Sequence, residues 1–134
     1  MLKQNTSVEI STELPDGVAV ISVGDDNSVF VSLAASLAEI RKLKGVMGYI
    51  LRSNTSAIID LTEQDKIIEY AVLSSQISES SSEMAKQFNL TDIESVLVEG
   101  KSVKVLCMGV GENKISVFME KTATHAWIIK RILL

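Results

Sequence analysis

The sequence predicts a single mixed α/β domain built on an antiparallel sheet, and three observations lead to this prediction. A chain of 134 residues is long enough for one core, because a domain of this size buries roughly two-thirds of its unfolded surface. Apolar residues make up 46% and charged residues 22%, which is a globular balance. Finally, the apolar residues recur every three to four positions in some stretches and every second position in others, so helices and strands are interspersed.

Composition and charge exclude several classes of protein. A net charge of −4 and a pI near 5.0 disfavour a nucleic-acid binder, since the thirteen Lys and Arg residues are also scattered. The single cysteine, Cys107, permits neither an internal disulfide nor a cysteine-cluster metal site, and its apolar surroundings predict a buried, inert thiol. The first residues lack the apolar core of a signal peptide, and no run approaches the roughly 18 apolar residues of a membrane span. We therefore expect a soluble, cytoplasmic protein.

Residues 1–28 are predicted to form an N-terminal extension that contains a hairpin, followed by the main domain at 29–134. Val8 and Ile10 alternate with polar residues, and a second apolar run covers residues 18–23. The residues between these runs include Pro15-Asp16-Gly17, which favours a turn because Pro presets one φ angle and Gly accepts a positive one.

A helix is predicted to follow the polar segment 24–28 and to end at Lys44. Positive side chains in its last turn suit the carbonyl end of a helix, and Gly45 is a typical left-handed stop. Its apolar stripe consists of Val29, Leu33, Leu37, Ile40 and Leu43.

Two strands come next, joined by a polar turn at 52–55. The first, 46–51, contains Gly48, which indicates a bend or the close approach of another backbone. The second runs over 57–61. The segment from Leu37 to Leu61 therefore predicts a helix, a glycine stop and a strand pair, and the other strands are expected to complete that sheet.

A long second helix is predicted over 63–88, with Thr62 and Asp65 as a capping box at its start. Ile68 and Val72 extend its apolar seam at one end. Serines crowd the middle of this helix although they are poor helix formers, and two explanations remain open: the small side chains let another helix approach closely, or this part faces water. The seam itself consists of Tyr70, Leu73, Ile77, Ser81, Met84 and Phe88.

Three more strands are predicted at 94–99, 102–108 and 114–119, because short turns join antiparallel neighbours. A final helix capped by Thr122, with Thr124 as a second candidate cap, runs to Leu134, with Ala126, Ile129 and Leu133 on one side.

The candidates for chemistry are weak. A phosphate-binding glycine loop must open a helix, whereas a strand is expected after Gly109-Val110-Gly111, so a hairpin turn is favoured. His125 has no second ligand at metal-binding spacing and is predicted to be a surface or half-buried residue. Lys130 and Arg131 on the apolar last helix allow contact with a membrane surface, but a helix packed on the sheet is favoured. We predict no catalytic, cofactor or metal residue, and no enzymatic activity.

The order of helix, two strands, long helix, three strands and helix resembles the roadblock / dynein light-chain domain family. The resemblance covers about four-fifths of the chain, from Val29 onward, and rests on the helix end and strand Leu43-Lys44-Gly45-Val46-Met47-Gly48-Tyr49-Ile50-Leu51. Many members carry Asp and Gly in the first strand turn, whereas this chain has Arg52-Ser53-Asn54-Thr55-Ser56. The hairpin before the first helix also lies outside the usual domain.

The resemblance implies a five-stranded antiparallel sheet with a longin- or profilin-like layout. It also implies a homodimer, or a heterodimer with a related domain, formed through the long helix and the strand after it. Such a dimer would act as a scaffold or regulator of a Ras-like small GTPase. The alternative is a ligand-sensing domain that binds a small molecule between sheet and helix. The expected dimer interface comprises Tyr70, Leu73, Ser74, Ile77, Ser81, Met84, Glu94, Val96 and Val98.

Overall fold

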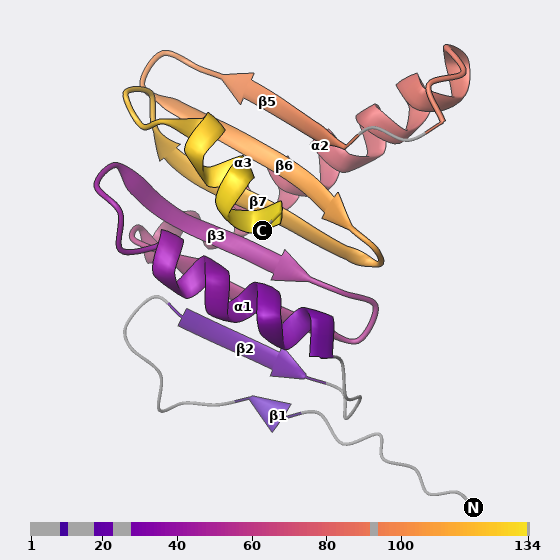
Figure 1. Cartoon of the computed structure of the whole chain (residues 1–134). Coiled ribbons are helices and arrows are strands. Elements are labelled where there is room, and N and C mark those ends of the chain that lie inside the picture. The colour runs from indigo at the N-terminus through magenta and orange to yellow at the C-terminus, as the bar shows by residue number, and fades with distance from the viewer. Residues whose placement is uncertain (1–8, 11–17, 23–27, 92–93, 134) are drawn as a thin grey trace, which may run out of the picture.

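The computed structural model describes residues 9–10, 18–22, 28–91 and 94–133, and the side chains from residue 28 onward. The elements alternate between strands and helices in the predicted order (Figure 1). The strands are β1 (Glu9–Ile10), β2 (Val18–Ser22), β3 (Val46–Arg52), β4 (Ser56–Leu61), β5 (Ser95–Glu99), β6 (Val103–Val110) and β7 (Asn113–Glu120). The helices are α1 (Ser28–Ile40), the short 3-10 helix η1 (Gln64–Lys66), α2 (Ile67–Gln87) and α3 (His125–Leu133).

All the strands join one antiparallel sheet in the order β1-β2-β4-β3-β7-β6-β5. The five predicted strands β3 to β7 are present, and β7 pairs with β3 to join the two halves of the sheet. β1 and β2 pair as the predicted hairpin, and β2 continues the sheet beyond β4. The expected hairpin turn at 15–17 lies outside the described residues. The division of the chain at residue 28 stays a prediction.

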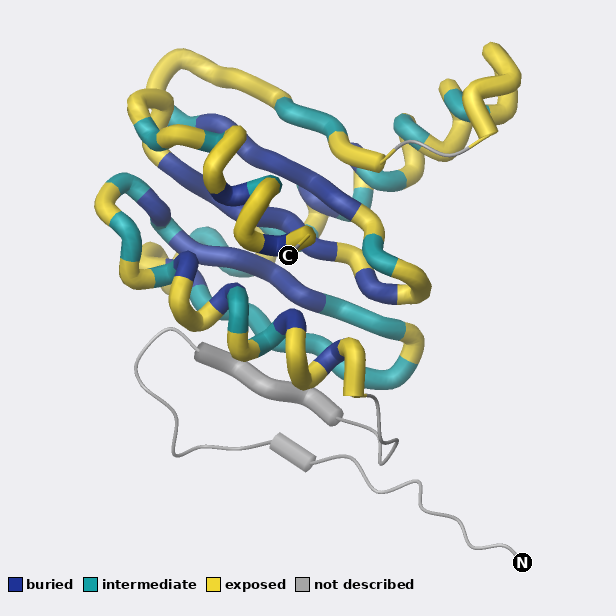
Figure 2. The backbone as a smooth tube through the Cα atoms, in the orientation of Figure 1, coloured by how far each residue is buried: buried dark blue, intermediate teal, exposed yellow. Residues whose placement is uncertain are grey.

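The helices form a layer on each face of the sheet. α1 and α3 lie side by side on one face, and α2 lies on the other (Figure 1). Most of the buried residues lie on the central strands β3, β7 and β6, which are largely dark blue in Figure 2. Each face has its own apolar cluster, which follows from the alternation of side chains along a strand.

The first helix is shorter than its sequence pattern predicted. α1 ends at Ile40 and not at Lys44, and the following residues form turns. Its buried stripe consists of Phe30, Leu33, Leu37 and Ile40, so the assignment of Val29 to this stripe was wrong because Val29 is 49% exposed. Gly45 does adopt the left-handed conformation, with φ of 90°, but it closes the turn after the helix.

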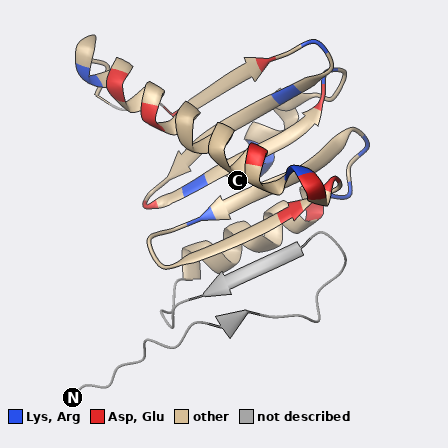
Figure 3. Ribbon diagram, turned by 180° about the vertical axis from the view of Figure 1, so that it is seen from behind, with Lys and Arg blue, Asp and Glu red and all other residues tan. Residues whose placement is uncertain are grey.

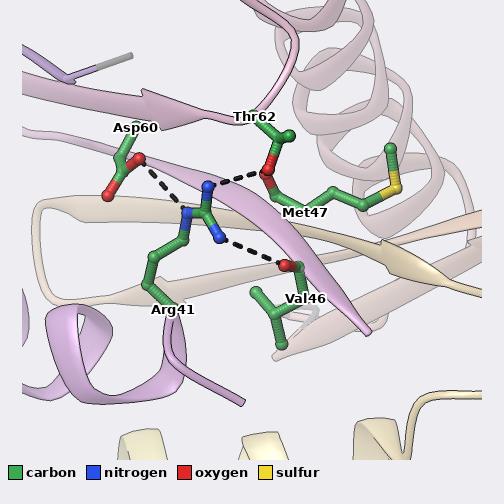
Figure 4. A network of polar contacts seen from close by, with 5 residues as sticks. All are labelled: Arg41, Val46, Met47, Asp60 and Thr62. Atoms are coloured by element: carbon green, nitrogen blue, oxygen red, sulfur yellow. Dashed lines mark hydrogen bonds and ion pairs between the residues drawn. The ribbon is translucent and has the colours of Figure 1, made fainter. Parts of the chain in front are cut away.

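Arg41, the first residue after α1, bonds across the neighbouring strands. Its guanidinium donates to Asp60 Oδ1 at 3.2 Å, to the Val46 carbonyl at 3.3 Å and to Thr62 Oγ1 at 2.8 Å (Figure 4). These bonds tie the end of α1 to the start of β3 and the end of β4. The predicted capping box was wrong, because Thr62 Oγ1 donates to the Met47 carbonyl and neither η1 nor α2 has a side-chain cap.

Gly48 behaves as predicted. A Cβ atom at this position would lie 2.2 Å from the Asp60 carbonyl oxygen and 2.7 Å from Leu61 Cα. The pairing of β3 with β7 also shifts register between Val46 and Gly48, which bends the strand. Both features that a glycine within a strand can indicate, a bend and the close approach of another backbone, are therefore present at Gly48.

The last part of the chain differs in detail from the prediction. The loop expected at 109–113 is shorter, because β6 extends to Val110 and β7 starts at Asn113. Gly111, with φ of 61°, turns the chain between them as a hairpin. On α3, Ile128 and Ile132 are buried and Ile129 is partly buried, whereas Ala126 and Leu133, which the sequence places on the same side as Ile129, are exposed.

Candidate functional site: the α2 face and the β5 edge

The N-terminal half of α2 packs on the sheet of its own chain. Ile67, Tyr70, Ala71 and Leu73 pack against the apolar cluster on this face, and Ile77 belongs to it. The Tyr70 ring stacks on the ring of Phe118 with centroids 4.5 Å apart and planes 8° from parallel. This half of the helix is therefore held by contacts that one chain supplies.

The serines of α2 do not simply face water. Ser74 is only 3% exposed, and its hydroxyl donates to the Ala71 carbonyl at 3.1 Å, one turn earlier. Ser81 is half-buried and donates in the same way to Ser78. A serine that bonds its own helix can lie against a neighbouring surface without an unsatisfied hydroxyl.

The C-terminal half of α2 extends past the sheet, where Figure 1 shows it projecting beyond β5. Apolar side chains at this end are exposed: Met84 to 45%, Phe88 to 69% and Leu90 to 54%. Ile68 and Val72 lie on the outer side of the helix and are also exposed, so their assignment to the packed seam was wrong.

A groove of about 890 Å³ separates this half of α2 from the sheet. Small residues line its helical side, and the strands β5 and β6 supply Val96 and Cys107. Lys86, Lys114 and Glu94 add charges around it. The sequence signal for the groove is the spacing of the small α2 residues Ser78, Ser81, Ser82 and Ala85, which places them on one side of the helix.

β5 is the last strand on its side of the sheet, so one of its backbone edges has no strand partner among the described residues. Val98 on this strand is 40% exposed. An edge of this kind can pair with a strand of another chain. This strand adjoins the groove, because Val96 of β5 and Glu94, which precedes β5, both line the groove.

The structure separates the residues predicted at the dimer interface into two sets. Tyr70, Leu73, Ser74 and Ile77 pack on the chain's own sheet. Of the other five, Ser81, Glu94 and Val96 line the groove, Val98 lies on β5, and Met84 is exposed near the end of α2. Their role in a dimer stays a prediction.

The remaining chemical candidates do not converge. Cys107 is buried as predicted, with its Sγ 3.4 Å from Ser116 Oγ, and burial raises the pKa of its thiol. His125 is half-buried as predicted, and its Nδ1 lies 3.1 Å from Lys104 Nζ. Cys107 packs in the α2-face cluster, whereas His125 begins α3 on the opposite face, so the two cannot act as a pair. Among the described residues, no group of three or more His, Cys, Asp or Glu side chains could hold a metal ion.

Comparison with known proteins supports the fold. No family model matches this chain, and no curated protein matches it in sequence. A solved structure of the Roadblock/LC7 domain from Streptomyces avermitilis matches it with a TM-score of 0.59 and 16% identity. The match covers 82% of this chain and 90% of the other. The chain therefore has a roadblock-like fold, as predicted. No helix in the described part of the chain is long and apolar enough to cross a membrane.

Proposed function

We propose that this chain is a non-enzymatic interaction module that dimerises through the C-terminal half of α2 and the β5 edge. The dimer then holds a Ras-like small GTPase as a scaffold or regulator. The observation that carries the proposal is the far half of α2, which projects beyond its own sheet with exposed Met84 and Phe88 at its end. Exposed apolar side chains clustered at one end of a helix mark a contact surface.

The groove supports a second copy of the chain as the partner. Ser78, Ser81 and Ala85 face it, and their small side chains leave room for another helix to lie close to α2. A second β5 strand pairing at the same edge would satisfy backbone groups that one chain leaves open. Together these features explain why a serine-rich segment is placed in the longest helix.

The GTPase part of the proposal rests on the family resemblance and the roadblock-like fold, which favour an interaction module. It is tested by gel filtration of the chain mixed with a Ras-like GTPase from the same organism, loaded with GDP or with a GTP analogue. We expect co-elution with the GTPase in one of the two states. Separate elution in both states would remove this part of the proposal and leave the dimer untouched.

The dimer is tested by Ser81→Trp, with Ser80→Trp as its matched control. Ser81 lines the groove, whereas Ser80 is exposed and lies on another side of the helix. We expect the first variant to weaken dimerisation by about 100-fold or more, because a buried steric clash costs on the order of 3 kcal/mol, and the second to change it less than about threefold. Sedimentation equilibrium measures both, and circular dichroism checks that both variants fold. Equal dimer affinities for the two variants would contradict the proposed interface.

The groove also favours the alternative function, a site for a small molecule between sheet and helix. Lys86 and Lys114 could bind an anionic group there, and the serine hydroxyls could add hydrogen bonds. The lining includes no aromatic ring, and ligand pockets usually contain several apolar or aromatic side chains. A monomeric chain whose melting temperature rises with a small anionic ligand would support this alternative over the dimer.

A further inference from the structure

The two faces of the molecule carry opposite charge, although the whole chain is acidic. Segments 28–45 and 121–133, which form the helical layer with α1 and α3, contain six basic residues and one acidic residue, a net charge of +5. Segment 62–91, which contains α2, has five acidic and two basic residues, a net charge of −3. Figure 3, which views the molecule from this second side, marks acidic residues in red along the ribbon of α2. Within the first layer, Arg41 is paired with Asp60 of β4 and Lys42 with Glu39, so its other basic residues are Lys44, Lys121, Lys130 and Arg131.

The outer side of α3 combines a tryptophan with two cations. Ile128 and Ile132 face the sheet, which places Trp127 and Lys130 on the opposite side of the helix. Trp127 is 44% exposed, and the Arg131 guanidinium lies 5.6 Å from the centre of its ring. A large amphipathic ring beside basic side chains is the combination that helices at the membrane interface present.

The outward side of α1 carries no unpaired acidic residue that would repel an anionic membrane surface. Its outward residues Val31, Ala35 and Ala38 are exposed, small and uncharged. The only acidic residue of the segment, Glu39, lies 3.6 Å from Lys42 in an ion pair. α1 and α3 lie side by side on the sheet, so their outer sides together form one surface (Figure 1).

We propose that the α1/α3 face binds the surface of an anionic lipid bilayer. Lys44, Lys121, Lys130 and Arg131 are exposed and supply the attraction to the lipid phosphates, and Trp127 enters the headgroup layer. This orientation leaves the groove and the acidic side of α2 turned away from the bilayer. Each basic side chain near an anionic surface strengthens binding about fivefold, so four of them give reversible attachment.

Trp127 makes the test direct, because it is the only tryptophan in the chain. The full chain is mixed with vesicles of phosphatidylcholine alone or with about one-third phosphatidylserine, and tryptophan emission and co-sedimentation are recorded. We expect binding and a shift of emission to shorter wavelength with the anionic vesicles only, and loss of both in high salt, since salt screens exposed charges. Absence of binding to anionic vesicles, or binding without an emission shift, overturns the proposal.

Lys130→Glu and Lys66→Glu form a matched pair, because each reverses one charge and they lie on opposite faces. Lys66 precedes α2, where a glutamate suits the helix N-terminus. We expect Lys130→Glu to reduce the fraction bound to anionic vesicles by about tenfold or more and Lys66→Glu to reduce it by about twofold at most. Equal losses would show that net charge, and not this face, governs binding, and would contradict the proposal.

Discussion

Within one chain, the two faces of the sheet bury different numbers of apolar side chains. The cluster under α1 and α3 contains fourteen buried residues of the described chain, whereas the cluster under α2 contains six. On the first face, both helices bury an apolar stripe against the strands. On the second, half of α2 lies over a groove and ends in exposed Met84 and Phe88. One chain therefore buries more apolar side chains on the α1/α3 face than on the α2 face, which is where we propose that a partner binds.

The largest expected effect comes from removing a buried side chain of the completed face. Leu37 is fully buried, so Leu37→Ala should lower the free energy of unfolding by about 2–5 kcal/mol through lost burial and the cavity left behind. Met84→Ala should change it by about 0.5 kcal/mol or less, because Met84 is 45% exposed. Urea unfolding at a concentration where the chain is monomeric measures both. Similar losses for the two variants would remove the contrast between the faces.

A smaller effect should appear at high pH. Burial, followed by the negative charge of Asp60, raises the pKa of Tyr49 from 10.0 to about 12. The unfolded chain ionises this phenol first, so stability is full below pH 10 and falls by about 2–3 kcal/mol as the pH rises from 10 to 12. Tyr49→Phe should lack this loss. Unfolding measured at several pH values in that window checks the difference, and parallel curves for the two proteins would contradict it.

The smallest expected effect concerns the contacts of Arg41. Arg41→Leu removes hydrogen bonds to Asp60, Val46 and Thr62 and should cost about 1–3 kcal/mol, because each net bond contributes about 1 kcal/mol or less at a partly exposed site. Lys42→Leu is the matched control. Its ion pair with Glu39 is solvent-exposed, so the expected cost is below about 0.5 kcal/mol. Thermal unfolding compares the two, and an equally small loss for Arg41 would show that the contacts in Figure 4 are incidental.

Local patterns predicted most of the fold. The alternation of apolar residues located β3 to β7, and Gly48 was predicted to mark either a bend or a close backbone, both of which are present. The errors arose where tertiary contacts decided the local structure. Arg41 and Thr62 resemble a helix end and a helix cap in sequence, but both side chains bond across the strands. No pattern within a segment reveals such distant partners.

The candidate site was harder to predict for a related reason. Periodicity showed that α2 has an apolar and serine-rich side, but not which surface that side meets. Tyr70 and Ile77 pack on the chain's own sheet, whereas Ser81 lines the groove and Met84 is exposed. The difference depends on where the sheet ends beneath the helix, and this is set by strand order, which the pattern of one helix does not contain.

Sedimentation equilibrium of the unaltered chain tests the central claim most directly. If the α2 face is incomplete in one chain, the protein should sediment as a dimer at tens of micromolar, an order of magnitude typical of moderate dimer affinities. The dimer should have twice the 14.6 kDa mass of one chain. A mass that stays at that of a single chain over this range would contradict the claim that a second copy covers the groove.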